Sequence, residues 1–181
     1  TDKSGIDIHI APGTKNESVH IPVIITETGL NDLVYNDFYV GADCDVDIIA
    51  GCGIHNSGCE TSQHDGVHTF HVGKNAKVRY VEKHYGEGEG TGERIMNPQT
   101  IVYLEEGASI HMETTQIRGI DSTKRYTKIV VGAGGEGVIT EKLLTHGRQT
   151  AESEMDIVLA GEDASGRVIS RSVAQDESRQ V

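Results

Sequence analysis

A strand-turn-strand pattern recurs six times along this chain of 181 residues. In each copy, a short run of alternating apolar residues leads into a turn rich in Gly, Asp and Asn, and a second alternating run follows. Counted at the apolar residue before each turn, the copies are 30, 32, 32, 27 and 28 residues apart, at Ile10, Val40, Val72, Leu104, Val131 and Leu159. One copy cannot bury its apolar face alone, so such copies stack on one another. The repeat predicts one domain over residues 1–181, a parallel β-helix, with a jelly-roll or cupin-like barrel as the alternative.

The apolar residues favour strands over helices. The chain contains 18 Ile and 17 Val but 6 Leu, together with 22 Gly and no Trp. Branched side chains suit a pleated sheet, whereas scarce Leu and abundant Gly disfavour packed helices. The predicted fold class is therefore all-β.

Charge and hydropathy exclude several functions. A net charge of −12 gives no electrostatic basis for binding nucleic acid. No apolar run reaches the roughly 18 residues of a membrane span, and no apolar signal sequence follows Thr1. Three cysteines are a poor match to a disulfide scaffold and fit a reducing cytoplasm. Because there is no initial Met and the repeat is unfinished at Val181, we expect a fragment of a longer protein.

The stretch 51–71 holds two cysteines and four histidines. Thiolates and imidazoles bind zinc and iron well, so Cys52, Cys59 and His64 are candidate metal ligands. A structural zinc protein that adds His68 to this set is one hypothesis. The chain has no pair of Cys-x-x-Cys knuckles, however, so the pattern of a zinc finger is absent.

Strand alternation separates the histidines of this stretch. If Phe70 and Val72 face the core, His68 shares their side and His71 faces away. This spacing also lacks the His-x-His element of a cupin metal site. All the cysteines and histidines of the stretch therefore cannot converge on one ion from an unbent strand.

Two acidic features allow a functional and an ordinary explanation. Asp43, Asp45 and Asp47 alternate along one face of a predicted strand, which keeps open a β-helix enzyme that acts on carbohydrate. Such enzymes usually carry aromatic platforms, whereas this chain has 2 Phe, 6 Tyr and no Trp. The run 86–93 alternates Gly with Glu or Thr, and we expect a flexible, solvated acidic loop there.

Five segments carry a family resemblance. They are Ile48-Ile-Ala-Gly-Cys-Gly, Gln63-His-Asp-Gly-Val-His, Gly73-Lys-Asn-Ala-Lys-Val-Arg-Tyr, Asp121-Ser-Thr-Lys-Arg-Tyr-Thr-Lys-Ile-Val-Val-Gly and Val168-Ile-Ser-Arg-Ser-Val-Ala-Gln-Asp-Glu-Ser-Arg-Gln-Val. In order and phase, these segments resemble the SufB/SufD family of iron–sulfur cluster assembly scaffolds. The likeness runs from about residue 37 onward, and the compact spacing is most similar to short, archaeal-type SufB-like members.

The resemblance implies a right-handed parallel β-helix that acts as a non-enzymatic scaffold. A transient iron–sulfur cluster would be built on it together with a SufC-type ABC ATPase, with no organic cofactor. The scaffold would be cytoplasmic, would pair with a second copy or a SufD-like paralogue, and would receive sulfur from a donor. The family's helical ATPase-binding part, second cysteine and Glu-His-Glu group are expected beyond Val181.

The resemblance also assigns roles to individual residues. It places the sulfur acceptor at Cys52, in a Gly-Cys turn where a thiol can ionise and be reached. His64 corresponds to the His of the family's Gln-x-His element, and His55 or His64 would favour the thiolate if either lay beside it. Glu82 and His84 are placed along a route through the helix, as cofactor-binding groups together with Cys52 and His64. The family has a Gln/Trp pair in that region.

Overall fold

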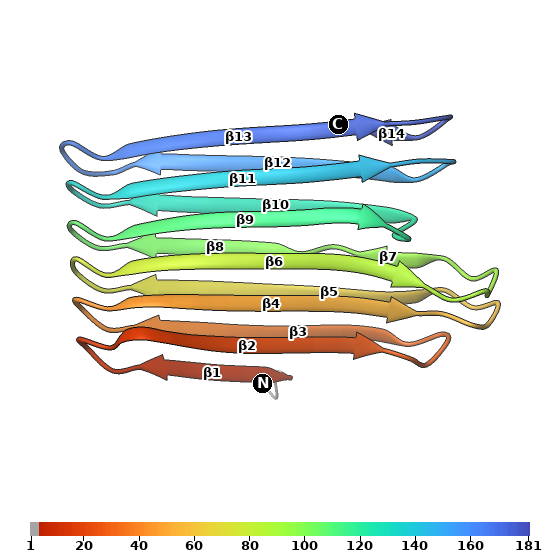
Figure 1. The fold of residues 1–181 in the computed structure, drawn as a ribbon, viewed down its shortest axis with the longest axis horizontal. Helices are drawn as coiled ribbons and strands as arrows, with labels where there is room; N and C mark the ends of the chain where they lie inside the picture. Colours follow the sequence, from red (N-terminus) through yellow and green to blue (C-terminus); the bar gives the residue numbers. More distant parts are fainter. Residues whose placement is uncertain (1–3) are drawn as a thin grey trace.

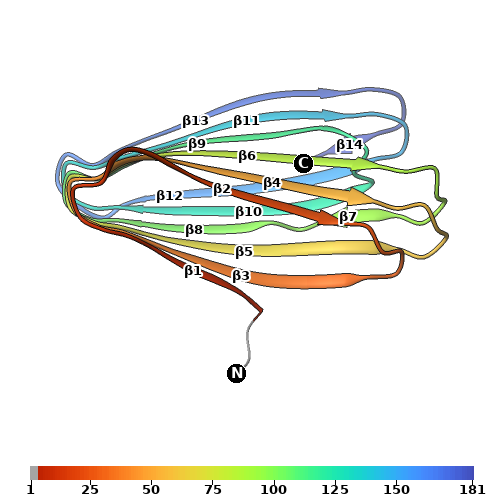
Figure 2. The ribbon, with the colours of Figure 1, turned by 60° about the horizontal axis from the view of Figure 1, so that its bottom comes forward.

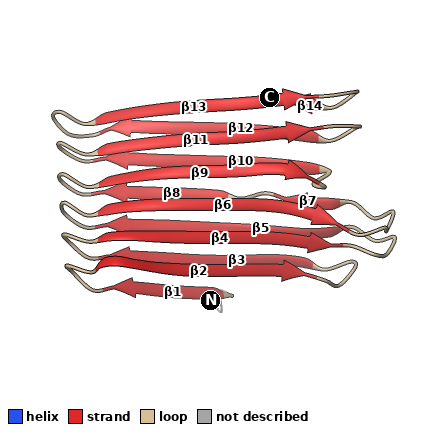
Figure 3. Cartoon of the chain, in the orientation of Figure 1, coloured by secondary structure: helices blue, strands red, loops and turns tan. Residues whose placement is uncertain are grey.

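The structure, a computed structural model, describes residues 4–181, and every regular element in this range is a β-strand (Figure 3). The strands are β1 (Gly5–Ile10), β2 (Lys15–Ile25), β3 (Asn31–Val40), β4 (Asp45–His55), β5 (Ser62–Val72), β6 (Lys77–Glu87), β7 (Arg94–Met96), β8 (Gln99–Leu104), β9 (Ser109–Arg118), β10 (Ser122–Val131), β11 (Glu136–Thr145), β12 (Thr150–Leu159), β13 (Ser165–Ala174) and β14 (Arg179–Gln180). No helix among these residues is long and apolar enough to cross a membrane.

The strands form two parallel sheets that face each other (Figures 1 and 2). Sheet A follows the order β1-β3-β5-β7-β10-β12-β14, with β8 beside β5 and β10. Sheet B follows the order β13-β11-β9-β6-β4-β2. Each coil of the chain thus adds one strand to each sheet, and the fold is the expected right-handed parallel β-helix. The jelly-roll and cupin-like alternative, which requires antiparallel strands, is wrong.

The register between coils is the one that the repeat predicts. All five successive pairs of the marker residues are Cα partners in sheet A: Ile10 with Val40, Val40 with Val72, Val72 with Leu104, Leu104 with Val131, and Val131 with Leu159. The turn after each marker contains one residue with positive φ, between 56° and 77°: Gly13, Asp43, Asn75, Gly107, Gly134 and Asp163. Only Gly, Asn and Asp enter this region readily, which explains the composition of the turns.

The apolar core lies between the sheets next to these turns. Phe38 stacks on Phe70 with ring centroids 4.4 Å apart, and Val102 and Ile129 continue the column fully buried. Tyr80 of sheet B packs against Phe70 from the opposite side at 4.8 Å. A second, smaller apolar cluster of Ile25, Cys52, Ile54, Met96 and Ile120 lies nearer the other end of the strands. The buried space between the two clusters is lined by polar side chains.

One strand of sheet A is interrupted in this polar region. The coil that contains β7 and β8 is broken between them by Asn97 and Pro98. Proline has no N–H and cannot donate to the ladder, so a break is expected where it occurs. The Asn97 N–H donates across the break to the His64 carbonyl at 3.3 Å.

The glycine-rich loop after β6 is hydrogen-bonded to the loop of the preceding coil. The Gly90 N–H donates to the Asn56 carbonyl at 3.1 Å, and the Gly92 N–H donates to the Gly58 carbonyl at 3.0 Å. A Cβ at Gly88, Gly90 or Gly92 would lie 2.0–2.3 Å from a carbonyl oxygen of that loop. The glycines therefore permit close backbone packing, while the acidic side chains Glu87, Glu89 and Glu93 are exposed, as expected of a solvated loop.

Gly90→Ala tests this packing. The added Cβ would lie 2.3 Å from the Gly58 carbonyl oxygen, so we expect the free energy of unfolding to fall by about 1–3 kcal/mol in urea denaturation. The matched control is Gly51→Ala, whose Cβ meets no atom within 4 Å and should leave stability unchanged or slightly raised. Equal stability of the two variants would show that the loop does not pack as described.

Candidate functional site

Cys52 lies in the middle of β4 and not in a turn. Its Cα partners are Val23 on β2 and His84 on β6, and its side chain is 4% exposed. Strand alternation turns Cys52 inward together with Ile48, Ala50 and Ile54, all of which are buried. The expected accessible Gly-Cys turn is therefore wrong, because its flanking glycines continue the strand.

Cys52 lines an enclosed cavity between the sheets. The cavity has about 10 Å³ open to the centre of a water molecule, which is room for about one water. Its lining residues are Cys52, His64, Gly66, His68, Glu82, His84, Met96 and Pro98. The four residues placed at the site from the sequence, Cys52, His64, Glu82 and His84, thus meet at one cavity. His68, which alternation turns inward as predicted, joins them.

His64 presents one free ring nitrogen to this interior. Its Nδ1 lies 2.8 Å from the Asp32 carboxylate on the neighbouring strand β3. Its Nε2 is buried and has no hydrogen-bond partner among the described residues. A Cβ placed on Gly66 would lie 3.6 Å from this Nε2 and 3.3 Å from the Nε2 of His68. The absence of a side chain at Gly66 therefore keeps the space beside both rings open.

His68 is held by two partners in one tautomer. The backbone N–H of Ile6 donates to Asn36 Oδ1 at 3.2 Å, which orients the Asn36 amide so that Nδ2 donates to His68 Nε2 at 3.3 Å. The proton of the neutral ring is then on Nδ1, 2.8 Å from the Tyr80 hydroxyl. Tyr80 in turn donates to Glu82 at 2.9 Å. Burial lowers the pKa of His68, in agreement with a neutral ring.

Glu82 is an ionised carboxylate in the centre of the molecule. It lies 2.5 Å from His84 Nε2 and 3.1 Å from Arg125 Nη1, and Arg125 Nη2 lies 3.2 Å from His84 Nδ1. Burial would raise the pKa of Glu82, but His84 and Arg125 outweigh it and hold this pKa well below its ordinary value. An opposite charge and hydrogen bonds make a buried charge tolerable, and both are present.

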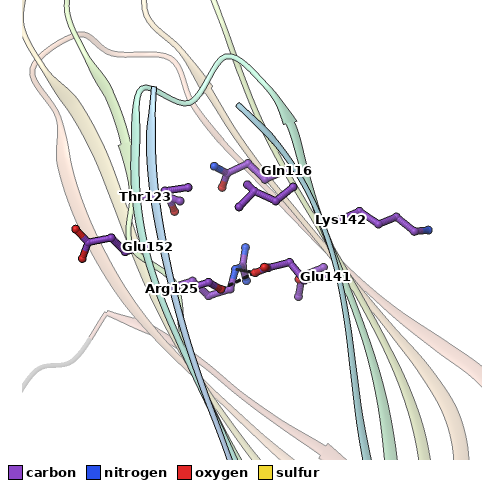
Figure 4. Close-up of a pocket in the computed structure, with 10 residues that line it drawn as sticks. Gln116, Thr123, Arg125, Glu141, Lys142 and Glu152 are labelled. Carbon is purple, nitrogen blue, oxygen red and sulfur yellow. Dashed lines mark hydrogen bonds and ion pairs between the residues drawn. The ribbon is translucent and has the colours of Figure 1, made fainter. Parts of the chain in front are cut away.

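A second small cavity continues the polar interior beyond Arg125. Figure 4 shows Arg125 and Glu141 reaching toward each other from opposite sheets, with Arg125 Nε 3.8 Å from the Glu141 carboxylate. The Ser153 hydroxyl donates to the same carboxylate at 2.6 Å. Two buried acceptors in the lining of this cavity, Thr114 Oγ1 and Gln116 Oε1, have no partner among the described residues. The cavity also has room for about one water, which could satisfy them.

Burial decides the protonation of Cys52. Desolvation raises the pKa of its thiol to about 12, and the nearby Glu82 carboxylate adds to the increase. The thiol is therefore protonated at neutral pH, whereas the sequence suggested a residue that ionises readily. Sulfur chemistry at Cys52 requires a group that accepts the thiol proton.

The other predicted ligands do not reach this cavity. Cys59 is exposed in the loop after β4, and His55 lies 3.5 Å from Glu87 at the surface. Cys59 therefore does not join Cys52 and His64, and residues 4–181 contain no cluster of three or more side chains suited to a metal ion. Cys44 is buried beside a turn and donates to the Ala11 carbonyl at 3.1 Å.

The aspartate row has a structural explanation. Asp45 lies 3.0 Å from the Arg79 guanidinium, and Asp47 is paired with the same side chain. The hydrogen bonds that the guanidinium donates to Asp45 and Asp47 raise the pKa of Arg79. Asp43 is the residue with positive φ in its turn. The feature that motivated a carbohydrate-active enzyme is thus a surface ion-pair cluster and a turn.

Sequence reasoning missed the partners that complete the site. Asp32, Asn36, Arg125 and Glu141 come from strands that supply no part of the 51–71 stretch. A signal for Arg125 was nevertheless present, because counting back in steps of two from the inward marker Val131 reaches it. A charged residue at an inward position predicts a buried partner.

The chain matches the model of a known family over most of its length. The model of the family described as "SUF system FeS cluster assembly, SufBD core domain" matches residues 33–181. No curated protein and no solved structure shows significant similarity to the chain.

Arg125→Met tests the buried ion network. It leaves Glu82 and Glu141 without their cation, so we expect a loss of about 3–5 kcal/mol in urea denaturation at about pH 7. Folding lowers the pKa of Glu82. Such a carboxyl group stabilises the folded protein at pH values above its unfolded pKa, which is about 4.3 for Glu. This contribution is lost as the pH falls toward the pKa in the folded protein. The variant carboxylates, lacking their cation, protonate more easily. The difference in the free energy of unfolding between wild type and Arg125→Met should therefore decrease as the pH falls to about 4.

Arg79→Met is the matched control for this substitution. It removes an exposed guanidinium from Asp45 and Asp47, and we expect it to cost less than about 1 kcal/mol. If Arg125→Met cost no more than Arg79→Met, Arg125 would not compensate the buried carboxylates.

Proposed function

The chain belongs to the SufBD core family of the SUF system for iron–sulfur cluster assembly, and on this premise we propose that it is a scaffold that accepts sulfur at Cys52. The sulfur then enters a transient iron–sulfur cluster, which is the cargo of the scaffold. The chain itself catalyses no independent reaction, and a SufC-type ABC ATPase supplies the driving force.

The convergence of Cys52, His64, Glu82 and His84 on one enclosed cavity carries this proposal. Cys52 supplies the thiol, and His64 directs an unpaired nitrogen into the same buried interior. Sulfane sulfur bound there is shielded from bulk water and from competing thiols. A cavity of this size admits a single sulfur atom but no organic cofactor.

The polar interior also supports a route for sulfur along the helix axis. Arg125 hydrogen-bonds to Glu82 and His84 beside the first cavity and lines the second one. Its guanidinium provides a fixed positive charge between the two cavities, and an anionic persulfide or hydrosulfide would be attracted to it. We propose that sulfur moves from Cys52 past Arg125 toward the cluster site.

The burial of Cys52 sets a condition on loading. A donor protein cannot place its own cysteine against a side chain that is 4% exposed. Loading therefore requires a local opening of the coil or a small sulfur carrier. We propose that the scaffold acts in the cytoplasm, in a SufB-like role, paired with a second copy or a SufD-like paralogue, and that the ATPase promotes this opening.

Cys52→Ser is expected to abolish sulfur acceptance while preserving the fold. The measurement is anaerobic reconstitution with the partner ATPase and a sulfur donor, followed by iron and sulfide analysis and mass spectrometry of persulfide. Cys59→Ser, at an exposed position outside the cavity, is the matched control and should behave as wild type. Normal cluster formation by Cys52→Ser would show that another residue accepts sulfur.

A further inference from the structure

Sulfur transfer to Cys52 includes a proton step that the proposed function leaves open. The Cys52 thiolate attacks the outer sulfur of a persulfide donor, RS–SH, so that a new S–S bond forms and the old one breaks. The products are the Cys52 persulfide and RS⁻, and sulfane sulfur passes between thiols without net oxidation. The thiol proton must first be removed inside a closed cavity, because Cys52 is protonated at neutral pH.

The hydrogen bonds around the cavity leave one free base. His68 Nε2 is occupied by the Asn36 amide, and both ring nitrogens of His84 are bound, one to Glu82 and the other to Arg125. Glu82 accepts from Tyr80, His84 and Arg125. His64 Nε2 alone among these groups is buried without a partner.

Asp32 determines which nitrogen of His64 is free. A carboxylate 2.8 Å from Nδ1 accepts the Nδ1 proton, so the lone pair of the neutral ring is on Nε2. The same carboxylate stabilises the imidazolium once Nε2 takes a proton. This is how a buried carboxylate orients a histidine base in hydrolases.

The pair also connects the interior with the surface. The His64 side chain is 3% exposed, whereas that of Asp32 is 30% exposed. The imidazolium formed when His64 takes a proton is therefore paired with a carboxylate that solvent reaches. The other titratable groups that line the cavity, His68, Glu82 and His84, are all buried, and so is Arg125 beside them.

We propose that His64 accepts the Cys52 thiol proton, directly or through one cavity water, and that Asp32 positions His64 and stabilises the imidazolium. The His64 imidazolium then gives this proton from Nε2 to the departing RS⁻, so the step is balanced and His64 returns to its starting tautomer. This inference rests on the proposed function for its sulfur donor. The predicted reactivity of the Cys52 thiol is independent of that function.

The test measures Cys52 in two reactions, with peptide-resolved mass spectrometry of the full chain. Persulfide loading uses inorganic polysulfide, and thiol reactivity uses iodoacetamide over a pH series. His64→Gln should slow both reactions at about pH 7 by roughly 100-fold or more. The alkylation rate of Cys52 in His64→Gln should then rise by about tenfold per pH unit, because the thiol itself must ionise. The wild-type rate should be much less dependent on pH.

Variants of Asp32 test whether this residue positions His64 as a base or only supports the fold. Asp32→Asn should slow both reactions by about 10- to 100-fold, and Asp32→Glu should restore part of the rate. Asp37→Asn, on the same strand but at a position that alternation excludes from the interior, is the matched control and should keep wild-type rates. Chemical denaturation of each variant verifies that it is folded.

A cavity variant tests the geometry without changing a titratable group. Gly66→Ala places a methyl group 3.3–3.6 Å from both Nε2 atoms and should slow the Cys52 reactions, whereas Gly51→Ala should not. The inference is overturned if His64→Gln and Asp32→Asn keep wild-type rates and pH profiles for Cys52. If instead wild-type protein alkylates as expected but never carries persulfide or a cluster, the proposed function fails and the proton pair stands.

Discussion

In-register stacking of parallel coils is the constraint on which the rest of the structure depends. Because side chains alternate with a period of two, each inward residue lies beside the inward residue at the same position in the next coil. In the apolar half of the interior this produces columns such as Phe38 on Phe70. In the polar half the same rule brings Cys52 beside His84, and Asp32 beside His64. A polar side chain that points inward in one coil therefore lies next to the inward side chains at the same position in the neighbouring coils.

Several hydrogen bonds of the polar interior join the two sheets. His68 and Arg125 belong to sheet A, whereas Tyr80, Glu82 and His84 belong to sheet B. Their hydrogen bonds cross the space that apolar side chains fill elsewhere. A buried charge of this kind does not by itself add stability, because desolvation opposes the Coulombic attraction. Its presence in place of further apolar packing is consistent with the proposed function.

The sequence was sufficient to predict the β-helix, its register and the inward side of His68, because turn residues and alternation carry that information locally. It was misleading at Cys52, since glycines on both sides are typical of a turn. In the structure Gly53 instead makes room for the ring of Tyr85, which a Cβ would meet at 2.5 Å. Asp32 and Arg125 could not be assigned as partners, because they are 32 and 43 residues from the groups they bind. Such pairing depends on the number of residues in each coil and on side-chain length together.

The break between β7 and β8 in sheet A lies in the wall of the cavity that contains Cys52. Met96 at the end of β7 and Pro98 within the interruption both line the cavity that contains Cys52. Opening the wall at this seam breaks fewer ladder hydrogen bonds than opening it through the middle of a continuous strand. The opening that the proposed function requires for loading Cys52 would therefore disturb the stacked coils least at this interruption.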